Sequence, residues 1–95
     1  MIGGSITEFV DLIYYGQEIV FSYQGHKYFI QGWWDTDQKE ATMVLDDVTE
    51  EHRGAYVWEY RAAKMSECAE AFLHAPLWSG CDFLQIEKDV AWTDW

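Results

Sequence analysis

The residues of this chain that are best suited to chemistry are carboxylates, and one run has the spacing with which a calcium loop begins. Asp35-Thr36-Asp37 supplies alternating oxygen ligands, and Asp46 stands at the twelfth position of such a loop. However, the fifth position is Lys39, and the sixth, which needs a glycine for its sharp turn, is Glu40. A cation beside the metal and a missing glycine argue against calcium binding.

Zinc is the second metal to consider. Cys68, His74 and Cys81, with His52, are residue types that zinc prefers, but the chain has no Cys-x-x-Cys pair and nothing in the spacing brings these side chains together. Free cysteines and a histidine at a helix end explain the same residues more simply. We therefore predict no metal site and no cofactor.

The sequence also lacks the motifs of common enzymes. Its serines and cysteines do not lie in a nucleophile elbow, and its glycines do not form a phosphate-binding loop. Carboxylates are so frequent that two of them close together say little about acid–base catalysis. We predict that the protein is not an enzyme, and the alternative is a small metal-dependent or hydrolytic enzyme that uses His26, His52 or His74.

Net charge narrows the range of partners. Seventeen Asp and Glu residues against six Lys and Arg residues give a net charge of −11. Such a chain is repelled by nucleic acids and anionic membranes and attracted to basic surfaces. We expect a protein partner with a basic surface, and no direct contact with nucleic acid or membrane. The simpler alternative is that the charge only maintains solubility.

Aromatic residues are unusually frequent for so short a chain. Phe, Tyr and Trp make up 18% of its 95 residues, and six of them are Trp. A domain of this size leaves much of its surface exposed, so we expect some of these rings at the surface. Exposed Trp and Tyr side chains are frequent anchors of protein interfaces. Trp33, Tyr56 and Trp58 are the candidates.

The N-terminal third predicts a helix and a hairpin. Ser5 and Glu8 have the spacing of a capping box, the following apolar residues repeat with helical period, and Gly16 suits the end of the helix, which gives a helix over residues 5–15. Apolar alternation in Gln17–Gln24 and Lys27–Trp34 predicts two strands joined by a tight turn. Adjacent Trp33 and Trp34 must then point to opposite sides of the sheet.

The rest of the chain completes an α+β fold. Ala41–Val48 and Ala55–Arg61 resume strand character, with Tyr56, Trp58 and Tyr60 expected on one face. Helical spacing returns over Ala62–His74, and we expect a short helix over residues 82–88 before an extended tail. The order predicts one domain over residues 1–95, with an antiparallel sheet of three to four strands and its helices packed on one face. The other face would be open to solvent or a partner.

The acidic residues form two groups in this arrangement. Short connections place the groups at opposite ends of the third strand, so that a line of negative charge could follow the sheet edge. Alternate strand residues lie about 6.6–6.8 Å apart, which is comparable to two phosphate steps of roughly 3.4 Å along a DNA strand. The candidate carboxylates are Asp35, Asp37 and Glu40 in one group and Asp46, Asp47, Glu50 and Glu51 in the other.

The chain resembles the small acidic inhibitors of bacteriophages and mobile elements, the anti-CRISPR and anti-restriction proteins. It shares with them a small size, a high negative charge, the lack of catalytic motifs and acidic clusters such as Asp46-Asp47-Val48-Thr49-Glu50-Glu51. The resemblance implies tight binding to a nuclease or its effector complex, with its nucleic-acid site blocked by charge mimicry. An immunity protein or antitoxin for a toxin nuclease and a module that pairs with its own copy are the alternatives. The N-terminus lacks the features of a secretory signal, so we expect a soluble, cytoplasmic protein.

Overall fold

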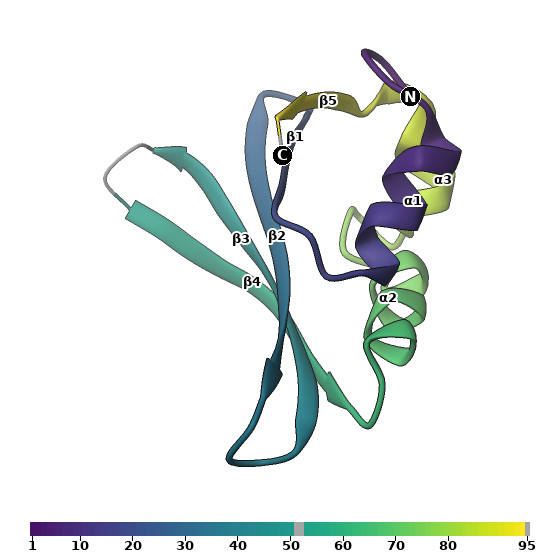
Figure 1. Ribbon diagram of the computed structural model, residues 1–95. Coiled ribbons are helices and arrows are strands. Elements are labelled where there is room, and N and C mark those ends of the chain that lie inside the picture. The colour runs from purple at the N-terminus through teal and green to yellow at the C-terminus, as the bar shows by residue number, and fades with distance from the viewer. Residues whose placement is uncertain (51–52, 95) are drawn as a thin grey trace.

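A computed structural model describes residues 1–50 and 53–94 and has an α+β fold. Three α-helices lie along one side of a single sheet, and the other side carries no helix (Figure 1). The helices are α1 (Ile6–Tyr14), α2 (Met65–His74) and α3 (Phe83–Ile86), and a 3₁₀ turn, η1 (Glu87–Asp89), follows α3. None of the helices in the described residues has the length and apolar character needed to cross a membrane.

The sheet has five antiparallel strands in the order β4-β3-β2-β1-β5. The strands are β1 (Ile19–Tyr23), β2 (His26–Asp35), β3 (Glu40–Glu50), β4 (Arg53–Ala62) and β5 (Ala91–Asp94). The prediction of three to four strands was therefore too low. The tail after η1 pairs with β1, and Trp92 packs edge-to-face against Phe9 of α1, with ring centroids 5.4 Å apart. The tail, which was predicted only to be extended, therefore forms an edge strand, and Trp92 is half-buried against the core.

Local signals placed the first elements well. The Ser5 hydroxyl accepts a hydrogen bond from the backbone N–H of Glu8 at 3.4 Å, and Gly16 follows α1 with a φ of +70°. Gln24 and Gly25 join β1 to β2 with φ values of +48° and +80°, as a two-residue hairpin turn requires. Helix α2 begins at Met65 rather than Ala62, because Ala62 still pairs with Ala41 in the sheet.

The core lies between the sheet and the helices and is built largely from aromatic rings. Phe83 of α3 stacks on Phe9 with centroids 5.0 Å apart and contacts Phe21 of β1 at 5.5 Å and Phe72 of α2 at 5.3 Å. All four rings are completely buried. Since the helices are committed to this layer, the sheet residues that point the other way have no helix against them.

Candidate protein-binding surface

The side of the sheet away from the helices forms one surface, which we call the open face. Cross-strand partners in an antiparallel sheet point to the same side, so the pairing of β2, β3 and β4 arranges its side chains in three rows. Successive rows lie about 6.8 Å apart along the strands. The rows are Trp33–Thr42–Arg61, Gln31–Val44–Glu59 and Phe29–Asp46–Tyr56.

Aromatic side chains stand in the two outer rows of the open face. Trp33 is 43% exposed and Tyr56 is 67% exposed, so both rings remain accessible. The two residues lie about 14 Å apart along the strands and two strand spacings, or about 10 Å, apart across them. Trp33 and Trp34 point to opposite sides of β2, as the sequence predicted, and Trp34 is exposed as well. The open face therefore offers two aromatic anchors within the span of an ordinary protein contact.

Tyr56 and Trp58 do not share a face, contrary to the expectation from their spacing. The pairing between β3 and β4 shifts by one residue at Val57, so that Asp46 opposes Tyr56 while Leu45 opposes Trp58. Such a β-bulge reverses the alternation on one strand. Trp58 consequently points toward the helices and packs on Phe72, with ring centroids 5.7 Å apart. It belongs to the edge of the core rather than to the open face.

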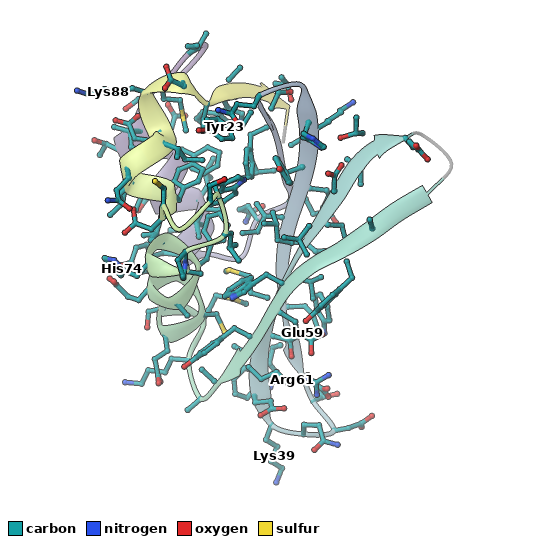
Figure 2. All side chains as sticks on the ribbon, turned by 180° about the vertical axis from the view of Figure 1, so that it is seen from behind. Tyr23, Lys39, Glu59, Arg61, His74 and Lys88 are labelled. Carbon is teal, nitrogen blue, oxygen red and sulfur yellow. The ribbon has the colours of Figure 1, made fainter. Side chains whose placement is uncertain are left out.

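The charged residues of the open face are partly paired. The guanidinium of Arg61 lies 3.5 Å from a carboxylate oxygen of Glu40 and 3.5 Å from one of Glu59. Figure 2 shows Glu59 and Arg61 on the side of the sheet away from the helices. Such exposed ion pairs add little stability. Asp46 lies on the same face without a cation in contact among the described residues, so the carboxylates of this face outnumber the cations beside them.

Thr42 lies at the centre of the first row and is only 1% exposed. Its hydroxyl has no hydrogen-bond partner within the described residues. A buried hydroxyl without a partner costs about 1–3 kcal/mol. Its neighbours across the strands, Trp33 and Arg61, are both substantially exposed. The central strand of the open face thus holds, in the row of Trp33 and Arg61, a polar group that is unsatisfied among the described residues.

The predicted acidic groups do not form a continuous line. Glu40 and Glu50 begin and end β3, so about 34 Å separates them, and β3 is not the sheet edge. At one end, Asp35 accepts hydrogen bonds from the backbone N–H groups of Asp37 and Gln38, and therefore stabilises the turn. Asp37 and Glu50 are exposed at opposite ends of β3, and Glu51 lies outside the described residues.

Asp46 and Asp47 were predicted in one group, but they lie on opposite faces because they are adjacent in β3. Asp47 points to the helix side, where a carboxylate oxygen lies 2.8 Å from Nδ1 of His26. Burial raises the pKa of Asp47, but hydrogen bonds from Thr49 and His26 outweigh it and keep the pKa below its usual value. Asp47 therefore serves a local network rather than the open face.

Sequence reasoning overlooked several residues of the open face. Glu59 and Arg61 were included in a strand but not considered as a site, although their alternation with Trp58 and Tyr60 is visible in the sequence. No signal in the sequence marks Thr42 as central, since its burial depends on the neighbouring strands.

The residues considered for metals are dispersed. Within the described residues no three His, Cys, Asp or Glu side chains group as metal ligands would. Cys68 is buried beneath the sheet, Cys81 is half-buried in the loop after α2, and His74 ends α2 near Glu70. His52 lies outside the described residues.

Comparison with known proteins adds no further constraint. The chain matches no protein-family model, no curated protein sequence and no solved structure.

Proposed function

We propose that this protein is a non-catalytic inhibitor that uses the open face to bind a nucleic-acid-handling protein, such as a nuclease or its effector complex. The observation that carries the proposal is the helix-free sheet face with Trp33 and Tyr56 exposed beside the carboxylates of Asp46 and Glu59. Aromatic rings supply the anchoring contacts of such an interface. The carboxylates supply complementarity to a basic surface.

Charge supports the choice of a basic partner. The net charge of −11 speeds encounter with a positively charged surface, and the same field repels nucleic acid. A nucleic-acid-binding groove is a basic surface of that kind. Bound there, the protein would exclude the nucleic acid by occupying its site, which is the mechanism of a charge mimic.

A second copy of the chain fits the open face less well. In a two-fold dimer each face meets its own image, so two surfaces with more carboxylates than cations are brought together. Like charges at the centre of an interface are unfavourable. An immunity protein for a toxin nuclease would use the same surface as the proposed inhibitor and would differ from it only in the target.

The test begins with capture of partners from a host lysate by the purified protein and by its Trp33→Ala and Tyr56→Ala variants. Tyr15→Ala is the control, because Tyr15 is exposed but lies beside α1. A relevant partner binds the wild type and the control, and binds each open-face variant at least about tenfold more weakly. A partner that binds all variants equally does not use the open face.

Charge-reversal variants separate local from long-range electrostatics. Asp46→Lys, Glu59→Lys and Asp11→Lys change the net charge by the same amount, but Asp11 is on α1. Only the first two substitutions should weaken binding markedly. Binding of the partner by the wild type and by every variant should weaken as the salt concentration rises. The captured partner should also lose nucleic-acid binding when the inhibitor is present. A partner whose nucleic-acid binding is unaffected would refute the inhibitory mechanism.

A further inference from the structure

A second surface feature lies on the helix side of the sheet and is separate from the open face. It is a cavity of about 320 Å³ between the β1–β2 hairpin and the loop that joins α2 to α3. Tyr23, which Figure 2 labels beside this region, contributes one wall. The size is at the lower end for small-molecule sites, so the cavity suits a ligand of about one ring system.

Two nearly buried aromatic residues line this cavity. Trp78 is 8% exposed and Tyr28 is 9% exposed, and their rings meet edge-to-face with centroids 5.9 Å apart. Trp78 also packs against Phe72 and Phe83, with centroids 6.2 Å and 6.0 Å away. These contacts hold the indole in one position before any ligand arrives.

The polar atoms of these two rings have no hydrogen-bond partner among residues 1–50 and 53–94. Among the described residues, no hydrogen bond forms to the indole N–H of Trp78 or to the hydroxyl of Tyr28. Buried Trp and Tyr side chains usually find such a partner. Within residues 1–50 and 53–94, the hydroxyl of Thr42 is the only fully enclosed side-chain polar atom without a hydrogen-bond partner. The unpaired polar atoms of Trp78 and Tyr28 are therefore not fully enclosed. Both residues line the cavity, and each carries a hydrogen-bond donor that has no partner in the described part of the chain.

His26 adds a group of the opposite kind. Its Nδ1 atom lies 2.8 Å from the Asp47 carboxylate, which can only accept, so Nδ1 carries the proton of that hydrogen bond. In the neutral ring Nε2 is then an acceptor. The His26 ring lies beside Tyr28, with centroids 6.2 Å apart at an interplanar angle of 29°. Donors and an acceptor thus line the same cavity.

The walls of the cavity are fixed by two tight turns. Gln24 and Ser79 have φ values of +48° and +53°, and each precedes a glycine. The Trp78–Cys81 segment is closed by two backbone hydrogen bonds of 3.1 Å and 2.9 Å. Strained backbone that the surrounding structure holds in place is frequent at binding sites, and a preformed wall lowers the entropy lost on binding.

From these observations we infer that the cavity binds a small uncharged planar ring in which a carbonyl lies next to a ring N–H, as in a pyrimidine base or another cyclic amide. The carbonyl oxygen accepts from both Trp78 and Tyr28, the ring N–H donates to His26, and the ring faces contact the aromatic walls. The hydrogen-bond donors of Trp78 and Tyr28 disfavour a cation, and the net charge of −11 disfavours an anion.

Uracil and uridine are suitable probes. The indole N–H resonance of Trp78, assigned through its contacts with Phe83, should shift as uracil is added to about 10 mM, a range above the roughly millimolar affinity expected of so small a ligand. Tyr28→Phe removes only a hydroxyl and should weaken binding about three- to tenfold. Tyr15→Phe is the matched control and should bind like the wild type, because Tyr15 lies elsewhere and is 71% exposed.

Cys81 gives an independent measurement because it also lines the cavity. Uridine should slow its alkylation by iodoacetamide. Benzene, which offers neither a carbonyl nor an N–H, should bind more weakly than uracil. The inference is overturned if uracil leaves the Trp78 resonance unchanged, if Tyr28→Phe binds as tightly as the wild type, or if benzene binds as well as uracil.

A short oligouridylate distinguishes the source of the ring. The acidic protein should bind it more weakly than free uridine at low salt, and tighter binding of the oligonucleotide would overturn the assignment to a free small molecule.

Because the cavity and the open face lie on opposite sides of the sheet, Trp33→Ala and Tyr56→Ala should leave uracil binding unchanged. Failure of this inference and failure of the proposed inhibitory function are therefore distinguishable.

Discussion

Gly32 of β2 lies where α1, α2 and the sheet meet, and its replacement by alanine tests that junction. The Gly32 backbone N–H donates to the carbonyl of Gly16 at 3.0 Å. A Cβ at position 32 would lie 2.8 Å from Sδ and 3.0 Å from Cε of Met65, and 3.1 Å from Cα of Gly16. Ordinary contacts between such atoms are about 3.5–4.0 Å. Met65 can change rotamer, but the Gly16 backbone is held by the turn after α1.

The magnitude follows from these distances. Overpacking of this kind costs about 1–3 kcal/mol, and alanine recovers about 0.5–1 kcal/mol of backbone entropy relative to glycine in a strand. A net loss of about 1–2 kcal/mol in the free energy of unfolding lowers the melting temperature of a domain of this size by roughly 5–15 °C. Thermal and urea unfolding followed by circular dichroism measure this loss of stability directly.

Gly54→Ala provides the matched control for this prediction. Gly54 is also in a strand, its φ is outside the left-handed region, and its new Cβ would meet only Cγ1 of Val48, at 4.0 Å. This variant should be as stable as the wild type or slightly more stable. Adding Met65→Ala to Gly32→Ala should cost less than the sum of the single changes, since the clash with sulfur is removed. Equal melting temperatures for Gly32→Ala and Gly54→Ala would refute the close packing at Gly32.

Two further predictions concern titratable groups. Burial raises the pKa of Asp47, but hydrogen bonds from Thr49 and His26 lower it by more, so the pKa is lower in the folded protein than in the unfolded chain. The ionised Asp47 therefore contributes to the free energy of unfolding above the unfolded pKa of about 3.9. This contribution is lost as the pH falls through the folded pKa. Asp47→Asn should therefore lower stability to urea at pH 7 but make little difference near pH 3, whereas a pH-independent difference would contradict this linkage. Burial raises the pKa of the Cys68 thiol, so iodoacetamide should alkylate half-buried Cys81 well before Cys68. Mass spectrometry of the modified peptides measures the two rates. Equal rates would show that Cys68 is accessible and would contradict this prediction.

Local sequence signals predicted the elements that depend on local physics. The Ser5 cap, the glycine after α1 and the β1–β2 turn are each set by a few adjacent residues, and the alternation in β2 correctly separated Trp33 from Trp34. The short helix near residue 83 and the extended tail were also predicted. What could not be predicted was that the tail pairs with β1, because that pairing joins residues about 70 positions apart and depends on Trp92 reaching Phe9.

The candidate surface was only partly predictable for a related reason. The period of two in β4 placed Tyr56 with Trp58, and one extra residue at Val57 moved Tyr56 to the other side. Nothing in the sequence around Val57 signals a bulge. Likewise, composition predicted an excess of carboxylates but not which of them have partners. Asp47 is engaged by His26, whereas Asp46, its neighbour in the chain, is not.

Strand β2 connects the two proposals, because its alternate residues supply both surfaces. His26 and Tyr28 face the cavity, while Phe29 and Trp33 face the other way. A slip of one residue in the pairing of β2 would exchange the two sets, so one register must be correct for both surfaces. The buried Tyr28 and Ile30 side chains hold that register from the core side. The core packing that stabilises the fold is therefore also what keeps the aromatic anchors on the open face and the hydrogen-bonding groups in the cavity.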